Sequence, residues 1–394
     1  MTHQRIYLDN AATTWPKPEA VYDAVDRYQR EIGAPNGRSG YREAQQSNRI
    51  VEQARLGVAQ LIGVSNPSHI VFGYNCSDML NMAIRGVVRP NDHVVTTVCD
   101  HNSVLRPLHM MREEMGVEVA YVPCDGQGFV SPDDVRAAIR PNTRLVAVNH
   151  ASNVTGAIQP IDEMGRLVRE TDALFLVDAA QSFGHVPIDL RTLEVDLLAA
   201  PGHKGLLGPL GTGVLYIRPG IEHEVKPLRY GGTGTQSDED RQPDVLPQKY
   251  EPGNHNLVGL AGLAAATEFL RAKTVEAIHA HHTRLVLKLI EELSDMEGVK
   301  IYGPKLAAER TSVVSITVEG YEPQELSAIL DSTYHIQTRA GFQCAPRMHD
   351  ALGTTAGGGT LRFSPGYATT LDEINTAIDA LRQIAEATVQ SNSG

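Results

Sequence analysis

The stretch APGHKGLLGPLGTG, residues 200–213, places one lysine, Lys204, among small and apolar residues. A surface lysine needs no such surroundings, but a nucleophilic lysine has to lose its proton and approach an electrophile closely. Glycines let the backbone come near a ligand without steric cost. Desolvation or a neighbouring cation lowers the pKa of a lysine and makes its amine nucleophilic. Lys204 is therefore the first candidate for a catalytic residue.

A carboxylate and an amide precede this lysine in the sequence. Asp178 ends the apolar run ALFLVD, and Gln181 follows shortly after it. Taken alone, an aspartate at such a position would most often cap a helix. Together with a lysine after the next predicted strand, it meets the needs of pyridoxal phosphate (PLP). The lysine would form a Schiff base, and the aspartate would keep the pyridine nitrogen protonated.

The elements that position these residues alternate between two apolar patterns. Residues 18–32 and 43–63 have helical spacing, and short β-rich runs follow them. Short strands separated by helices predict a mainly parallel sheet with helices on both faces. Polar residues follow five of these strands, and because ligands bind at the carboxyl ends of such strands, one composite site is expected. The runs are 69–73, 93–98, 117–123, 144–150, 174–180, 195–200 and 213–218.

The second half of the chain has a different pattern. A polar, Gly/Pro-rich stretch is followed by one long helical stretch over 257–293 and then by a smaller set of strand and helix signals. We predict a large PLP-binding α/β domain over 19–270. Residues 1–18 and 271–394 would form a small α+β domain.

Several motifs together resemble one known family. YLDNAATT, DHNSV, SNVTG, VDAAQS and GHKGLLGPLGTGVLY are similar to motifs of the class V aminotransferase family of fold-type I PLP enzymes. Within that family, TRAGFQCAP resembles the group II, or SufS-type, cysteine desulfurases and selenocysteine lyases. The motifs run from residue 7 to residue 366, nearly the whole chain. The resemblance implies a mainly parallel seven-stranded sheet sandwiched by helices, a smaller α+β C-terminal domain, and a homodimer whose sites use residues of both chains.

The resemblance assigns roles around the cofactor ring. Lys204 corresponds to the Schiff-base lysine, Asp178 to the partner of the pyridine nitrogen, and Gln181 to the donor to the ring hydroxyl. His101 corresponds to the histidine that stacks on the ring and shuttles protons. Asn153 corresponds to a residue near the ring hydroxyl and the substrate. Without the resemblance, His101 would more often be structural and Asn153 a turn residue.

The phosphate of the cofactor needs donors as well. Cys76 and Ser77 begin a predicted helix, where free N–H groups and the helix dipole favour an anion. They take the place of hydroxyl residues that are usual in the family, and His203 corresponds to a further phosphate ligand. Pro201 stands where a serine is common. Asn254 stands where a threonine often reaches the phosphate in the partner subunit.

Cys344 corresponds to the nucleophilic cysteine. An isolated cysteine is more often a small buried hydrophobe, but its loop, RAGFQCAPRMHDALG, is polar and contains glycine. Arg339 and Arg347 would lower the pKa of a neighbouring thiol. Arg362 corresponds to the arginine that binds the substrate carboxylate, which its bidentate fork suits, and Arg339 is a further substrate-binding candidate. Whether the Gly-rich segment 353–360 forms a mobile lid stays open.

These assignments imply a cysteine desulfurase that converts L-cysteine to L-alanine and leaves a persulfide on Cys344 for a protein sulfur acceptor. Selenocysteine lyase, cystine or cysteine C–S lyase and class V aminotransferase activities on the same scaffold are alternatives. A non-catalytic sulfur carrier is disfavoured because Lys204 and Asp178 are retained. A dinucleotide-dependent oxidoreductase would need a GxGxxG fingerprint, which is missing. The sulfur could serve iron–sulfur clusters, thiolated tRNA or a specialised pathway.

Composition narrows the range of partners. The net charge is −12, with 47 acidic against 35 basic residues, which disfavours nucleic acid or an anionic membrane as the main partner. No run reaches the about 18 apolar residues of a membrane span. The N-terminus lacks the apolar core of a signal peptide, so a cytoplasmic location is expected.

Cysteine and histidine positions give no sign of a metal site. The four cysteines are scattered and form no CxxC pair, so neither a disulfide framework nor a zinc site is expected. The sequence HAHH contains His279, His281 and His282. On a polar helix without further Cys or Glu ligands, we expect these histidines to be solvated.

Overall fold

The computed structural model describes residues 5–37, 39–236 and 238–392. Its largest element is a seven-stranded sheet with the strand order β2-β8-β7-β6-β5-β3-β4. Neighbouring strands from β7 to β4 run parallel, whereas β8 is antiparallel to both of its neighbours. The predicted α/β fold with a mainly parallel seven-stranded sheet is confirmed. The strands are β2 (Ile70–Gly73), β3 (His93–Thr97), β4 (Glu118–Val122), β5 (Thr143–Asn149), β6 (Leu174–Asp178), β7 (Leu197–Pro201) and β8 (Gly213–Ile217).

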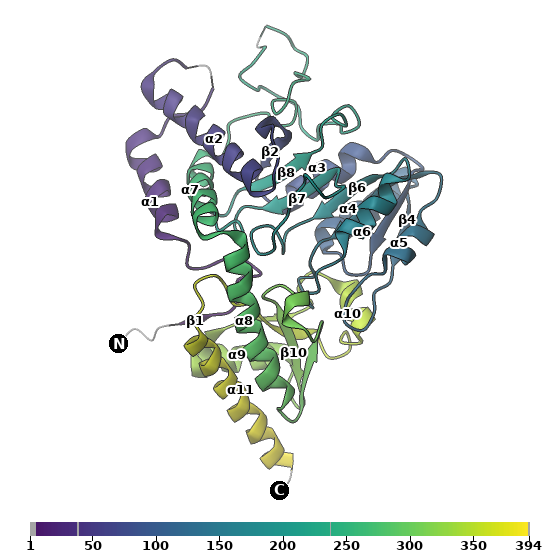
Figure 1. The fold of residues 1–394 in the computed structure, drawn as a ribbon, viewed down its shortest axis with the longest axis vertical. Coiled ribbons are helices and arrows are strands. Elements are labelled where there is room, and N and C mark those ends of the chain that lie inside the picture. The colour runs from purple at the N-terminus through teal and green to yellow at the C-terminus, as the bar shows by residue number, and fades with distance from the viewer. Residues whose placement is uncertain (1–4, 38, 237, 393–394) are drawn as a thin grey trace.

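Helices cover both faces of this sheet (Figure 1). Helices α3 and α4 pack on one face, in an apolar cluster that includes Leu80 and Leu108. Helices α2, α6 and α7 pack on the other face, in a cluster that includes Val58, Met164 and Leu263. Because both faces are buried, the strands are continuous apolar runs. The helices are α1 (Glu19–Arg27), α2 (Arg42–Leu61), α3 (Cys76–Val87), α4 (Asn102–Met115), α5 (Pro132–Ala138), α6 (Ile161–Arg169) and α7 (Leu257–Lys273).

A four-stranded antiparallel sheet, ordered β12-β13-β10-β9, lies at the centre of the C-terminal part. Its apolar cluster takes Leu289 from α8 and Ile378 from α11. Leu8 joins the same cluster because β1 pairs with β11. None of the described helices is both long and apolar enough to cross a membrane. The elements are β1 (Ile6–Tyr7), α8 (Val275–Ser294), β9 (Val299–Tyr302), β10 (Val314–Val318), α9 (Pro323–Tyr334), β11 (Ile336–Gln337), β12 (Arg339–Gly341), α10 (Pro346–Leu352), β13 (Thr360–Phe363) and α11 (Leu371–Asn392).

The single long helix expected over 257–293 is wrong, because the structure has two helices that meet at Thr274. This residue has a φ of 66°, which is uncommon for a β-branched side chain. Its hydroxyl accepts a hydrogen bond from the Ala277 N–H at 3.2 Å and so caps α8. The apolar spacing continues across the break, which is why the pattern does not reveal it. The predicted division of the chain near residue 270 stays a prediction.

His282 corrects the expectation of solvated histidines on this helix. Its side chain is 2% exposed, and its ring lies 5.1 Å from the ring of His185, which is also buried. Neither ring nitrogen of His282 has a hydrogen-bond partner among the described residues. His279 and His281 are partly exposed. Helix α8 therefore turns His282 inward, against the loop that follows β6.

We predict that the folding stability falls as the pH drops from 6.5 toward 4. Burial lowers the pKa of His150 and of His185 to about 4, while an unfolded histidine titrates near 6.5. Between these values the unfolded state binds more protons, so the stability is full above pH 6.5 and is lost below it. At pH 5, each of the two rings lowers the free energy of unfolding by about 2 kcal/mol relative to its value at neutral pH.

Urea unfolding at pH 7.5 and pH 5.0 measures this loss. A His185→Gln variant should lose less stability between the two pH values than the wild type. The matched control His109→Gln, at an exposed histidine, should lose as much as the wild type. An equal loss in wild type and His185→Gln would contradict the assignment.

Candidate active site

The candidate site lies at the carboxyl ends of the parallel strands. Asn149 and Asp178 are register partners at the ends of β5 and β6, and β7 leads directly into the turn that carries Lys204. A cavity of about 230 Å³ opens at this edge. The residues that the sequence analysis assigned to the cofactor, other than Asn254, all line this cavity, and so does Pro201. They are Cys76, Ser77, His101, Asn153, Asp178, Gln181, His203 and Lys204.

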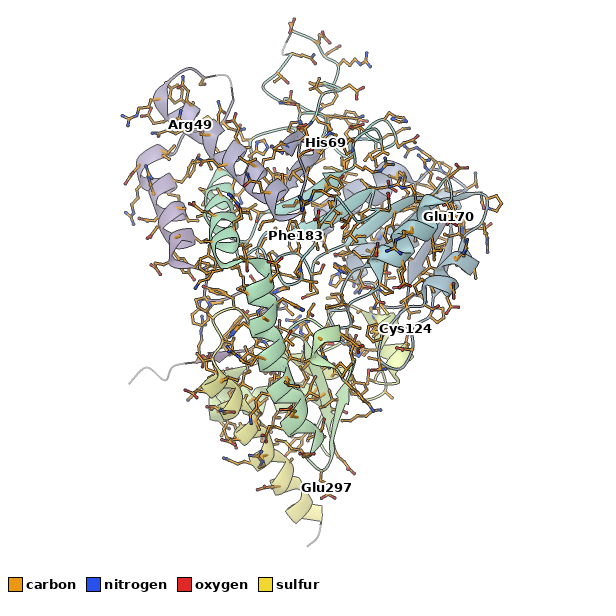
Figure 2. All side chains as sticks on the ribbon, viewed as in Figure 1. Arg49, His69, Cys124, Glu170, Phe183 and Glu297 are labelled. Carbon is orange, nitrogen blue, oxygen red and sulfur yellow. The ribbon has the colours of Figure 1, made fainter. Side chains whose placement is uncertain are left out.

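Glycines on both sides of Lys204 allow its turn to pack closely. A Cβ on Gly205 would lie 2.3 Å from the Phe183 carbonyl oxygen, and one on Gly202 would lie 2.1 Å from the Thr212 hydroxyl. Phe183 itself lies near the centre of the molecule (Figure 2). Neither contact could be relieved without moving the turn. The glycines therefore explain how a single lysine is held in such a crowded place.

The electrostatic surroundings of Lys204 favour a neutral amine. Burial lowers the pKa of Lys204, and the Arg362 guanidinium lowers it further. The Cys76 thiol and the carboxylates of Asp178 and Asp9 act in the opposite direction. Because burial is the largest effect, the amine loses its proton more easily than an exposed lysine, as a nucleophile or a base requires.

The N-terminal segment clamps the same turn, which the sequence reasoning missed. The Thr14 N–H, the Thr13 hydroxyl and the Lys17 Nζ donate to the His203 carbonyl at 3.1, 3.2 and 2.7 Å. The Thr14 hydroxyl donates to the Lys204 carbonyl at 2.9 Å. Burial lowers the pKa of Lys17 to about 7. The motif YLDNAATT marked this segment, but only the fold shows what it contacts.

Asp178 is buried at the floor of the cavity. Its Oδ1 accepts hydrogen bonds from the Ala180 N–H at 2.9 Å and from the Cys76 thiol at 3.7 Å. Burial raises the pKa of Asp178, and burial together with the Asp178 charge raises that of Cys76. Since its thiol faces Asp178, Cys76 would offer a phosphate only its backbone N–H at the start of α3. Its role as a phosphate donor stays a prediction.

His101 caps helix α4 and is held in one orientation. Its Nδ1 accepts from the Ser103 N–H at 3.0 Å, which leaves the proton of the neutral ring on Nε2. Burial, followed by the Lys204 charge, lowers the pKa of His101 to about 4. The hydroxyls of Ser103 and Ser77 lie 2.6 Å apart. Ser103, which lines the cavity, belongs to the motif DHNSV, but the sequence analysis gave it no role.

His203 supplies an unused polar atom at the cavity. Its Nδ1 is buried and has no hydrogen-bond partner within the described part of the chain. Burial lowers the pKa of the ring to about 3. A buried polar atom without a partner is costly, and a phosphate oxygen in the cavity would satisfy this one. Gln181 already donates from Nε2 to the Ala11 carbonyl at 2.9 Å.

Arg362 is held by a carboxylate that the sequence analysis did not identify. Its Nη2 lies 2.8 Å from Asp9 Oδ1, and its Nη1 donates to the Asn153 carbonyl at 3.0 Å. Its Nε is buried without a partner among the described residues. Arg339 is the register partner of Arg362 on the neighbouring strand. The guanidinium is therefore fixed in place while its Nε–H has no partner among the described residues, and substrate binding by both arginines stays a prediction.

A strained turn exposes Cys344. Gln343 and Cys344 have successive φ values of 41° and 61°, a conformation that residues other than glycine adopt only where their surroundings enforce it. Asn153 donates to the Gln343 carbonyl at 2.6 Å, and the Asn102 N–H donates to the Cys344 carbonyl at 2.8 Å. The Arg347 guanidinium lies over the Tyr121 ring at 3.7 Å, so its predicted influence on the thiol stays a prediction.

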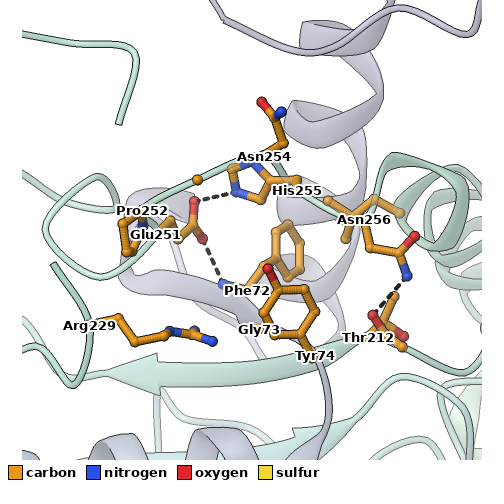
Figure 3. Close-up of a pocket in the computed structure, with 13 residues that line it drawn as sticks. Phe72, Gly73, Tyr74, Thr212, Arg229, Glu251, Pro252, Asn254, His255 and Asn256 are labelled. Atoms are coloured by element: carbon orange, nitrogen blue, oxygen red, sulfur yellow. Dashed lines mark hydrogen bonds and ion pairs between the residues drawn. The ribbon is translucent and has the colours of Figure 1, made fainter. Parts of the chain in front are cut away.

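Asn254 lies outside this cavity, in a second pocket that also contains Tyr74 and Arg229 (Figure 3). Glu251 and His255 also line this pocket. The Glu251 carboxylate lies 2.8 Å from the Arg55 guanidinium and 2.9 Å from the His255 ring. Burial raises the pKa of Glu251, but these two partners outweigh it and lower the value to about 2. Contact between Asn254 and the phosphate in a second copy of the chain stays a prediction.

With this geometry in place, comparison with known proteins decides the family. The sequence profile described as Aminotransferase class-V matches residues 6–376. The chain belongs to this family. Class V aminotransferases and cysteine desulfurases depend on PLP. The resemblance seen in the sequence is confirmed.

Relatives and solved structures agree over almost the full length. A protein of Methanothermobacter thermautotrophicus strain Delta H, named probable cysteine desulfurase, is 37% identical over 391 residues, which cover 98% of this chain and 96% of the relative. A relative of Dictyoglomus turgidum named cysteine desulfurase IscS is 30% identical and covers 97% and 95%. The apo structure of cysteine desulfurase from Thermococcus onnurineus NA1 matches with a TM-score of 0.91 at 32% identity, covering 97% and 95%.

The buried ion pair between Arg55 and Glu251, at the second pocket, leads to a prediction about folding stability. Arg55→Met would leave the Glu251 carboxylate buried without its main counter-charge, which costs about 3–5 kcal/mol. Arg30→Met is the matched control, because Arg30, in the helical turn after α1, forms an exposed pair with Asp26, and such pairs contribute about 0–1 kcal/mol. Urea denaturation at pH 7.5 compares the two variants. A loss below 1 kcal/mol in Arg55→Met would contradict the assignment.

Proposed function

We propose that this chain is a PLP-dependent cysteine desulfurase that converts L-cysteine into L-alanine and retains the sulfur as a persulfide on Cys344. One observation carries the proposal. The strained turn that exposes Cys344 is hydrogen-bonded to Asn102, the residue next to His101 at the cavity of Lys204 and Asp178. The turn that carries the candidate thiol is thus tied through its backbone to the loop that carries His101, although the two come from distant parts of the chain. Simple transamination has no use for such a thiol.

The residues around the cavity fit PLP. Lys204 offers the amine, Asp178 a buried carboxylate for the pyridine nitrogen, and His203 a free Nδ1 beside the N-terminus of α3 for the phosphate. When bound, PLP supplies an electron sink for the bond-breaking step. Cofactor binding by this chain is part of the proposal.

Each of four side chains around the substrate has a separate role in the proposed reaction. Arg362 binds the carboxylate through the part of its guanidinium that Asp9 and Asn153 leave free. Neutral Lys204 removes the Cα proton. The Cys344 thiolate then attacks the substrate sulfur. The new S–S bond forms as the C–S bond breaks, the electron pair stays on carbon, and a proton on that carbon completes alanine. Neutral His101, with its proton on Nε2, is placed to move that proton.

The partners are part of the same proposal. Asn254 lies in a pocket apart from Lys204, which supports a homodimer in which each chain completes the other's site. The exposed position of Cys344 suits transfer of the sulfur to a protein acceptor. We also propose that the protein is located in the cytoplasm.

The first test measures the products formed from L-cysteine by the PLP-loaded protein with a thiol reductant. Alanine and sulfide should appear in equal amounts. Lys204→Ala should lower the rate by roughly 10² or more, because it removes the base, and Cys344→Ser should abolish sulfide release. Lys273→Ala, at an exposed lysine, is the matched control. Full alanine formation by Cys344→Ser would contradict the role of Cys344. Sulfide released together with pyruvate instead of alanine would indicate a C–S lyase, and turnover of selenocysteine alone would indicate a selenocysteine lyase.

Asp9 gives a second prediction about this site. Asp9→Asn removes the charge that orients Arg362, so the KM for L-cysteine should rise about tenfold, equivalent to about 1.4 kcal/mol, while kcat changes less. Asp23→Asn, on the exposed side of α1, should leave both parameters unchanged. Steady-state kinetics of alanine formation separates the two constants. An unchanged KM in Asp9→Asn would show that Arg362 does not depend on Asp9.

A further inference from the structure

Two cysteines outside the candidate active site meet at one edge of the large sheet. Cys99 follows β3 and Cys124 follows β4, two residues beyond the register pair Thr97 and Val122. Beyond the last register pair the two segments stay close, because the Val98 N–H donates to the Val122 carbonyl at 3.0 Å, and Cys99 follows in the turn after β3. Neighbouring strands lie about 4.8 Å apart, which is within the Cα separation that a disulfide spans.

The sulfur atoms share one site beneath helix α10. The Cys99 thiol donates to the Gly128 carbonyl at 3.6 Å, and the Cys124 thiol lies 3.9 Å from the Met348 sulfur. Met348 also covers Gly128, where an added Cβ would lie 2.7 Å from its methyl carbon. Cys124 lies beside α10 in Figure 2.

The two thiols differ in access and in acidity. Cys99 is fully buried, whereas Cys124 is partly exposed. The influence of the Cys124 thiol, followed by burial, raises the pKa of Cys99, and the influence of the Cys99 thiol lowers the pKa of Cys124. The exposed partner is therefore the one that ionises first, as an attacking thiol must, while the buried partner is placed to resolve a mixed disulfide.

We propose that Cys99 and Cys124 form a redox-active dithiol, separate from Cys344, that a low-molecular-weight disulfide oxidises to an intramolecular disulfide. The Cys124 thiolate attacks one sulfur of the disulfide RSSR, forms a mixed disulfide and releases RS⁻. Cys99 then gives up its proton and attacks the Cys124 sulfur, which releases the second RS⁻. Two protein thiols and RSSR become one protein disulfide and two RSH, so atoms and electrons balance.

The experiment equilibrates the PLP-loaded protein in buffers with graded ratios of reduced to oxidised glutathione and traps free thiols with N-ethylmaleimide. Tryptic peptides are then mapped without reduction. Cys99 lies in peptide 86–112 and Cys124 in peptide 113–136, so their disulfide appears as one cross-linked species. We expect this species, with two fewer alkylated thiols, in the wild type and in Cys344→Ser. Cys124→Ser should lose it.

Two results would overturn the proposal. One is recovery of both peptides in alkylated form even in the most oxidised buffer. The other is glutathione bound to Cys124 while Cys99 is still alkylated, since this would show that the buried thiol does not resolve the mixed disulfide. The wild-type and Cys344→Ser maps decide the question even if substitution of a cysteine in the pair impairs folding. The readout does not depend on desulfurase activity.

Discussion

The buried amine of Lys204 is the constraint on which the site depends. An ammonium removed from water costs several kcal/mol unless nearby charges compensate it. Asp178 and Asp9 offset part of that cost. Asp178 ends β6 of the large sheet, and Asp9 follows β1, which pairs with the C-terminal part. Burial is still the largest effect, so the amine loses its proton more easily than an exposed lysine would.

The sequence predicted the large sheet and the residues at its carboxyl edge for a physical reason. Parallel strands buried on both faces are continuous apolar runs, and each polar residue that ends such a run stands out. Asp178, His101 and Lys204 were identified in this way and by the motifs around them. The register between neighbouring strands then brings them to one cavity, which no local pattern has to encode.

The features that were missed depend on contacts between distant segments. The ion pair of Asp9 with Arg362 and the hold of Lys17 on the His203 carbonyl have no periodic signal in the sequence. The break at Thr274 and the burial of His282 were missed for a related reason. Helical spacing records which residues share a face, but the packing partner decides whether that face is solvated and where the helix stops.

The N-terminal segment has a consequence for the order of events during synthesis. Residues 6–17 are synthesised well before their hydrogen-bond partners, which include His203, Gln337 and Ser364. These contacts have a very large sequence separation, and such contacts slow folding because a long loop must close before they form. The clamp on the turn that carries Lys204 joins residues 190 positions apart, and the segment that supplies it is itself paired with the C-terminal part. A chain that ended before β11 and β13 would keep the donors of this clamp but would lose the pairing that holds their segment in place.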